Sequence, residues 1–233
     1  MPGSITHIAI ADKMIEILGD EKFENIPLFY CGSIGPDAIH ARPGFCREDK
    51  KRTHLREGIR DAEFSAQENQ ELFHNRVKNF IDERIVKGNK YNDFLKGYVV
   101  HLLADELFMK TIRSEYIKAM KGEEKTQKGK DFFDGFMFDL DDIDYRLARE
   151  YPFSRNVREE LYKEWGYSVE GLLIHEELSG SKWWVCDKFF DNKTIKYKSP
   201  KYITYNRMLD FIDECAMNIV VQLSDDKMYR GLF

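Results

Sequence analysis

The chain has 233 residues, of which 42% are hydrophobic and 14% aromatic, so it can bury a core without disulfide bonds and is not a disordered protein. Its 36 Lys and Arg residues against 41 Asp and Glu residues give a net charge of −5, and we expect no stable nucleic-acid partner. No apolar run approaches the roughly 20 residues that a membrane-spanning helix needs. The composition makes no prediction about the oligomeric state.

The expected compartment follows from the start of the chain and from its cysteines. Residues 1–7 have neither the basic nor the apolar segment of a secretory signal. The four cysteines form no Cys-x-x-Cys pair: Cys31, Cys46, Cys186 and Cys215. We therefore expect reduced thiols in a cytoplasmic protein, with a Cys31–Cys46 bridge only if the N-terminus has been processed.

Helical periodicity dominates the sequence. Apolar residues at spacings of three and four predict helices over residues 7–18, 63–86, 92–109, 111–120, 142–150, 155–178 and 204–223. The segment 92–109 is apolar around most of its circumference, which predicts the most buried helix. No alternating strand pattern recurs, so we expect an all-α fold. We expect a single helical domain over 1–233, with a metal-site half at 1–110 and a helical half at 111–233.

The ends of the first helix and three connecting segments have their own signals. Ser4 or Thr6 is the expected cap of the first helix, and Gly19 its end. Residues 20–60 hold several Pro and Gly residues and predict a long loop that can include short helical turns, and long loops are usually functional or mobile. We expect an exposed, charged linker at 121–130 and an ordered loop or short hairpin at 179–203.

The most informative pair of polar residues lies in the predicted buried helix. His101 and Asp105 are four residues apart, so their side chains share one helix face, one turn apart. A carboxylate in such an apolar setting must be ion-paired, hydrogen-bonded or metal-bound. The spacing alone leaves two interpretations open, a His–Asp hydrogen bond that orients the helix and a metal site.

Further metal-ligand residues come from separate predicted elements. His7 begins the first helix, Asp37 follows the Gly-Pro turn at 35–36, His40 lies three residues later, and His54 follows the loop. Imidazoles and carboxylates from separate elements suit zinc or a similar divalent ion. Each of these histidines taken alone is as readily explained as a solvated side chain.

The order of these residues resembles the zinc-dependent phospholipase C family, which is similar to the single-strand nucleases with a trinuclear zinc site. The residues that carry the resemblance are Thr6-His7, Gly32-Ser33-Ile34-Gly35-Pro36-Asp37, Thr53-His54 and Gly97-Tyr98-Val99-Val100-His101-Leu102-Leu103-Ala104-Asp105. It covers roughly the first 110 residues, and 111–233 match only as a helical continuation.

The resemblance implies a set of zinc ligands and a helical fold of the same type. One zinc ion would be held by Asp37, His54, His101 and Asp105, and His7 with the bridging Asp105 would form part of a second site. His40 is an additional candidate ligand. The family's third zinc needs a His-x-x-x-Glu pair, which is missing here because Ser179 lies four residues after His175. We therefore expect one or two zinc ions.

By this resemblance, the reaction would be hydrolysis of a phosphodiester, in a phospholipid or a nucleotide. A divalent ion lowers the pKa of a bound water from 15.7 toward about 7, which makes that water a nucleophile. Asp37 would be a ligand or the general base. The alternatives are a non-catalytic, metal-stabilised helical protein and a metal phosphohydrolase of the HD type. The absence of a His-Asp dipeptide argues against the HD type.

Other polar and aromatic segments have simpler interpretations. We expect the acidic run 139–144 to cap a helix at 142–150 rather than to bind calcium, because it lacks the Gly and the terminal Glu of a calcium loop. His74 is expected to be solvated. Trp183-Trp184 is expected in core or interface packing rather than at a lipid-facing mouth. The basic run 50–52 is expected to be a solvated loop rather than a site that attracts an anionic substrate.

Overall fold

A computed structural model describes the chain except for residues 121–129, 165–166, 193, 195–198, 226–228 and 230–231. The all-α prediction is confirmed, since the described residues form helices and only an isolated bridge between Val169 and Leu173. The α-helices are α1 (Ser4–Leu18), α2 (Ile26–Ser33), α3 (Arg47–Thr53), α4 (Gln67–Arg84), α5 (Asn92–Lys110), α6 (Ile112–Met120), α7 (Lys130–Glu150), α8 (Val157–Lys163), α9 (His175–Val185) and α10 (Tyr205–Asp225). Three 3-10 turns, η1 (Asp20–Lys22), η2 (Pro36–Ala41) and η3 (Asp61–Glu63), and the π-helical turn η4 (Cys186–Asp191) lie between them.

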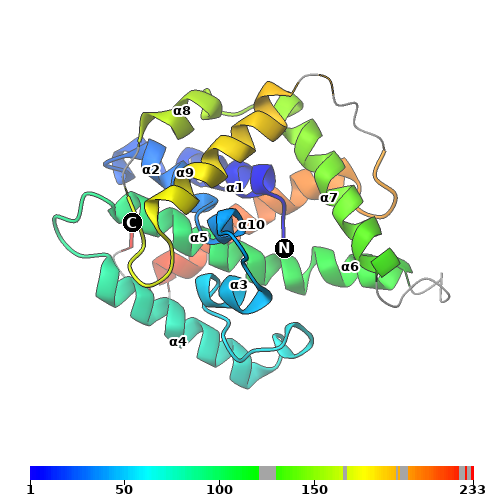
Figure 1. Cartoon of the computed structure of the whole chain (residues 1–233), viewed down its shortest axis with the longest axis horizontal. Helices are drawn as coiled ribbons and strands as arrows, with labels where there is room; N and C mark the ends of the chain where they lie inside the picture. Colours follow the sequence, from blue (N-terminus) through cyan, green and yellow to red (C-terminus); the bar gives the residue numbers. More distant parts are fainter. Residues whose placement is uncertain (121–129, 165–166, 193, 195–198, 226–228, 230–231) are drawn as a thin grey trace.

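Helix α5 is the centre of the fold, as its apolar circumference predicts. It crosses the middle of the molecule and contacts α1, α2, α4, α6, α10 and η2 (Figure 1). The buried hydrophobic residues form one core cluster that runs from α1 to the last described residues. The division of the chain at residue 110 stays a prediction.

Two glycines allow α2 and α5 to pack almost backbone to backbone. A Cβ atom on Gly97 would overlap the carbonyl oxygen of Phe29, and one on Gly32 would overlap that of Phe94. Only glycine fits at such a close helix crossing. The crossing brings the backbone of Ser33, at the end of α2, against the face of α5 that carries His101.

Helix α1 begins at Ser4 and is capped by a residue far away in the sequence. Neither Ser4 nor Thr6 is its N-cap, because the cap position is Gly3 and makes no side-chain bond. Instead the Asp144 carboxylate accepts hydrogen bonds from Ile5 N at 2.9 Å and from Thr6 N and Thr6 Oγ1 at 3.1 and 2.8 Å. A carboxylate at a helix N-terminus satisfies free N–H groups and favours the helix dipole.

The prediction of an acidic N-cap within 139–144 is therefore wrong, because this run lies inside α7. Asp139 accepts from the backbone N–H groups of Lys201, Tyr202 and Ile203. Two carboxylates on the side of α7, Asp139 and Asp144, thus each bind backbone N–H groups of a distant segment.

The prediction of a long loop over residues 20–60 is wrong, since α2, α3 and two 3-10 turns lie there. Pro27 is one of the prolines on which the loop prediction rests, and it occupies the first turn of α2, where its missing N–H is not needed. Asn25 caps the helix by accepting from Leu28 N at 3.0 Å. Because every residue from Leu28 to Ser33 is buried, the segment shows no helical periodicity.

Three further boundaries differ from the prediction. The predicted helix 142–150 is the last part of α7, and the predicted helix 155–178 is interrupted between Lys163 and His175. Residues 179–191, expected in a loop or hairpin, form the rest of α9 and η4.

Most of the predicted linker 121–130 lies outside the described residues. None of the described helices is long and apolar enough to cross a membrane.

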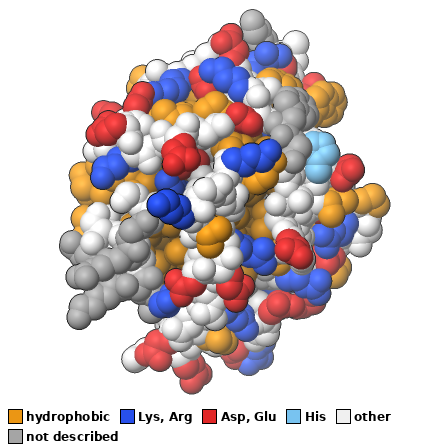
Figure 2. Space-filling view, turned by 90° about the vertical axis from the view of Figure 1, so that its left-hand side faces the viewer, with side chains coloured by type: hydrophobic (Ala, Val, Ile, Leu, Met, Phe, Trp, Pro, Cys, Tyr) orange, Lys and Arg blue, Asp and Glu red, His pale blue; other side chains and the backbone are white. Residues whose placement is uncertain are grey.

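Charge on the surface is mixed. On the face in Figure 2, Lys and Arg side chains are interspersed with Asp and Glu side chains, and apolar groups lie between them. This matches the nearly balanced counts of basic and acidic residues. On this face the structure offers no broad field of a single sign.

Candidate metal centre

The structure brings five sequence-predicted ligands together from four elements. His7 comes from α1, Asp37 from η2, His54 from the end of α3, and His101 and Asp105 from α5. Their side-chain donor atoms form two overlapping groups, one of His7, His101 and Asp105 and one of Asp37, His54 and His101. Within each group all donor atoms lie within 4.8 Å of one another.

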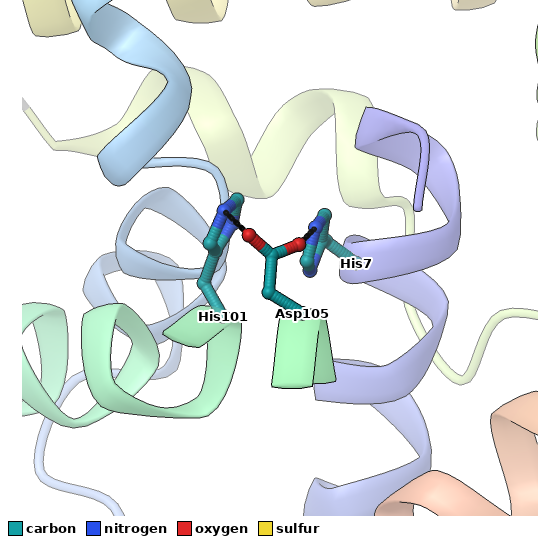
Figure 3. A group of neighbouring side chains, drawn as sticks. All are labelled: His7, His101 and Asp105. Atoms are coloured by element: carbon teal, nitrogen blue, oxygen red, sulfur yellow. Dashed lines mark ion pairs between the residues drawn. The ribbon is translucent and has the colours of Figure 1, made fainter. Parts of the chain in front are cut away.

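In the first group, Asp105 lies between two imidazoles (Figure 3). Its Oδ1 is 3.4 Å from His7 Nε2, and its Oδ2 is 3.9 Å from His101 Nε2. The rings of His7 and His101 stack with centroids 3.7 Å apart and an interplanar angle of 11°. All three side chains are buried. The carboxylate therefore has one nitrogen near each of its oxygens.

The second group continues from His101 toward η2. His54 Nε2 lies 3.3 Å from His101 Nε2, 3.3 Å from Asp37 Oδ1 and 3.5 Å from Asp105 Oδ2. Ligand atoms bound tetrahedrally to zinc at 2.0–2.1 Å would lie roughly 3.3 Å apart. Four of the six edges of a tetrahedron of donors from Asp37, His54, His101 and Asp105 thus measure between 3.3 and 3.9 Å.

The orientation of two imidazoles is set by backbone carbonyls. His101 Nδ1 lies 2.8 Å from the Ser33 carbonyl oxygen, and His54 Nδ1 lies 2.8 Å from the Lys50 carbonyl oxygen. A carbonyl can only accept, so each Nδ1 carries the hydrogen and each Nε2 of a neutral ring presents its lone pair. This is the arrangement in which proteins hold metal-binding histidines.

Several buried polar atoms of the centre lack a hydrogen-bond partner. His7 Nε2 and both carboxylate oxygens of Asp105 make none within the described part of the chain. Buried polar atoms are almost always paired, and an unpaired carboxylate is costly. A cation shared by the facing nitrogens and oxygens would satisfy them, so the donor set fits a metal ion.

Burial and charge shift the pKa values at the centre in the direction that metal binding needs. Burial, with a smaller effect of His7, lowers the pKa of His101 to about 3, so its ring is neutral at pH 7. Burial acts to raise the pKa of Asp37, but the charge of Lys50 and the bond with His54 hold it well below its usual value. Burial likewise acts on Asp105, and the neighbouring imidazoles, His7 first, outweigh it and lower its pKa.

Two side chains at the edge of the centre, His40 and Lys50, differ from what the sequence predicts for them. His40, the additional candidate ligand, joins neither group, and its Nε2 lies 3.7 Å from Asp37 Oδ1. Lys50, expected in a solvated loop, lies in α3 with its Nζ 2.8 Å from Asp37 Oδ1 and 3.0 Å from His40 Nε2. The sequence feature that could have identified Lys50 is its spacing of four residues from His54, which places both residues on one helix face once α3 is recognised.

The prediction of a solvated His74 is wrong. Its Nδ1 lies 2.6 Å from the Tyr229 hydroxyl, and its Nε2 lies 3.0 Å from Glu106 Oε1.

Trp183 and Trp184 are exposed, which contradicts a place in the core. The four cysteines are free thiols, with Cys46 alone exposed.

Comparisons of the chain with models of protein families, with curated proteins and with solved structures give no match. The resemblance to the zinc-dependent phospholipase C family stays a prediction. The His and Asp cluster itself is a finding of the structure, and it is a group that could bind a metal ion.

Proposed function

We propose that this chain is a metal-dependent hydrolase of phosphoric esters that resembles the zinc-dependent phospholipases C. One observation carries the metal centre: the Nε2 lone pairs of His54 and His101 face each other at 3.3 Å, next to the unpartnered carboxylate of Asp105. Two lone pairs and a carboxylate repel one another unless a cation lies between them. Nitrogen and oxygen donors in a tetrahedral arrangement favour zinc among the common divalent ions.

The two donor groups define how many ions this set can hold. Both groups need His101 Nε2, because His101 Nδ1 is bonded to Ser33. One nitrogen lone pair binds one ion. We therefore assign the first ion to Asp37, His54, His101 and Asp105, and the orphaned Nε2 of His7 beside Asp105 Oδ1 to the start of a second site.

The chain's own residues would position the ester and move the proton. A bound divalent ion supplies a Lewis acid for a phosphoryl oxygen and lowers the pKa of water. The backbone carbonyls of Ser33 and Lys50 keep the imidazoles in place for that ion. Asp37 is the most exposed of the five donors, so it is the residue that we propose to accept a proton from the attacking water as well as to bind the ion.

The proposal is tested by elemental analysis together with turnover of a chromogenic phosphodiester. The wild type is expected to retain close to one zinc ion or more per chain and to hydrolyse the ester. Asp37→Asn should lose the turnover, whereas the matched control Asp82→Asn, an exposed carboxylate paired with Lys78, should keep it. Turnover that survives chelation of the metal would contradict the proposal.

Burial favours a second candidate, a non-catalytic metal site that fastens η2 and α3 to the core. The side chains of His7, His54, His101 and Asp105 are at most 4% exposed, as in closed structural sites. Metal retained without turnover of phosphodiesters, phosphomonoesters and carboxylic esters would favour this candidate. The proposed function also includes a phospholipid or a nucleotide as the substrate and a cytoplasmic location.

A further inference from the structure

The side chains of the candidate metal centre and its neighbours differ in exposure. Four of the donors are at most 4% exposed, whereas Asp37 is 18%, Lys50 24% and His40 48% exposed. Exposure therefore rises from α5 through η2 to the face shared by α3 and His40. Lys50 and His40 are thus the more exposed side chains beside Asp37, and we take this edge as the opening of the centre.

Lys50 is held at this opening by two contacts. Its Nζ lies 2.8 Å from Asp37 Oδ1 and 3.0 Å from His40 Nε2. The Asp37 contact is an ion pair, whereas the His40 contact is a hydrogen bond. An ammonium group has three donors and no acceptor, so it can also donate to a further acceptor. The His40 ring in turn packs edge-on against Phe45, with centroids 4.7 Å apart, which limits where the imidazole can move.

The sign of the charge at the opening depends on the metal ion. Asp37 and Asp105 contribute two negative charges and Lys50 one positive charge, so the set carries about one negative charge and attracts a cation. With a divalent ion bound, the same set carries about one positive charge and attracts an anion.

We propose that Lys50, steadied by His40, binds an anionic oxygen of the substrate beside the metal ion. The substrate class is then an ester that carries negative charge at its reacting group, such as a phosphate ester, rather than a neutral carboxylic ester or amide. This proposal rests on the proposed metal centre. An amine and a metal ion that flank one phosphoryl group form a clamp of the kind that stabilises phosphoryl transfer.

The next residue in α3 provides a matched control. Lys51 carries the same charge, and its side chain is 18% exposed, but its Nζ pairs with Glu48 at 3.1 Å. It belongs to neither donor group and contacts none of the five donors in the ion pairs of the structure. Lys50→Gln and Lys51→Gln therefore change the net charge equally and differ in whether they touch the centre.

The experiment measures zinc affinity and inorganic phosphate affinity in the same proteins. Protein loaded with zinc and dialysed free of excess metal is titrated with phosphate by calorimetry. We expect Lys50→Gln to weaken phosphate binding at least tenfold and to tighten zinc binding severalfold, because a competing cation has been removed. Lys51→Gln should change both affinities less than twofold, and Lys50→Arg should keep phosphate binding within about threefold.

Results that overturn this proposal can be distinguished from results that overturn the proposed function. A wild type that binds no zinc overturns both proposals. Zinc binding with phosphate affinity that is unchanged in Lys50→Gln overturns this one alone. Should Lys50→Gln fail to fold, acetic anhydride labelling of the zinc-loaded wild type decides: phosphate should protect Lys50 but not Lys51, and equal labelling of Lys50 with and without phosphate overturns the proposal.

Discussion

Helix α5 places two neighbouring carboxylates, Asp105 and Glu106, in two different environments. Both are buried, with 3% of each residue exposed. Glu106 Oε1 lies 3.0 Å from His74 Nε2 and 2.6 Å from Lys110 Nζ, and His74 in turn lies 2.6 Å from the Tyr229 hydroxyl. Asp105 has imidazoles around it and no hydrogen-bond partner.

This difference separates a structural pair from a candidate binding site. A His–carboxylate pair that leaves no buried polar atom without a partner gains nothing further from a ligand. A carboxylate left unpaired among nitrogen lone pairs is stabilised by any cation that fits. Burial and proximity to histidine are common to both carboxylates, so the number of unsatisfied atoms is what distinguishes them.

The largest expected effect concerns metal affinity. Asp105→Asn removes the anionic donor of the group that it forms with His7 and His101, which is also a proposed ligand of the first ion, and we expect it to weaken zinc binding by about 100-fold or more. Glu106→Gln leaves every donor in place and should change the affinity less than threefold. Competition with a chromogenic chelator measures both values. Equal losses in the two variants would mean that the centre does not depend on Asp105.

Gly97→Ala tests the close crossing of α2 and α5, which holds the Ser33 carbonyl against His101. A Cβ atom there would overlap the Phe29 carbonyl oxygen, so α2 must move away and take the Ser33 carbonyl with it. We expect a loss of about 3 kcal/mol in the free energy of unfolding, measured in urea. The control is Gly180→Ala in α9, whose Cβ would meet Ala41 at 3.4 Å, an ordinary contact. A tolerated Gly97→Ala would show that the helix crossing has more room than the structure gives it.

In the zinc-free protein the two carboxylates are expected to differ in how strongly they stabilise the fold. Glu106→Gln loses charge-assisted bonds to His74 and Lys110 and should destabilise the protein by about 2 kcal/mol. Asp105→Asn removes a charge that the neighbouring imidazoles favour, as its lowered pKa indicates, but it removes no hydrogen bond, so the loss should be smaller, about 1 kcal/mol. Urea unfolding in the presence of a chelator gives both numbers. A larger loss in Asp105→Asn than in Glu106→Gln would contradict the comparison.

A pH dependence follows from the pKa of His101, which burial lowers to about 3. Between pH 6.5 and 3, the unfolded chain binds a proton at this residue and the folded chain does not. The free energy of unfolding of the zinc-free protein should therefore fall on acidification over this range, by about 1.4 kcal/mol per pH unit from this group. His101→Asn, which can still donate to Ser33, should show a slope smaller by about one proton, and an unchanged slope would contradict the assignment.

The spacing of His101 and Asp105 is a local property that sequence reasoning could use, whereas the set of five donors was implied by the resemblance to the zinc-dependent phospholipase C family. His101 and Asp105 share a helix face at any position in a fold, and the apolar residues around them predict their burial. What the sequence did not show was how the donors are held. Ser33 and Lys50 act through backbone carbonyls, which every residue has, so no residue type marks them.

The parts of the fold that were missed share a physical cause. Helix α2 is buried on all sides and therefore lacks periodicity, and α7 caps α1 through Asp144 over a separation of 139 residues from Ile5. His74 was assigned to solvent from its neighbours on α4, whereas its partners Glu106 and Tyr229 come from elsewhere in the chain. Tertiary contacts of this kind override local pattern, and no window of sequence contains them.

The smallest expected effect concerns Tyr229, which contacts His74 of the hydrogen-bonded His74–Glu106 pair. Tyr229→Phe removes the hydroxyl that lies 2.6 Å from His74 Nδ1 and leaves a buried ring of nearly the same shape. We expect a loss of about 1 kcal/mol in the free energy of unfolding, the usual contribution of one hydrogen bond, and no change in zinc affinity. Because His74 reaches Glu106 and not Asp105, a change in zinc affinity would show that the two carboxylates communicate along α5. Identical zinc titrations of the variant and the wild type, measured alongside that small destabilisation, would instead confine the His74 network to support of the fold.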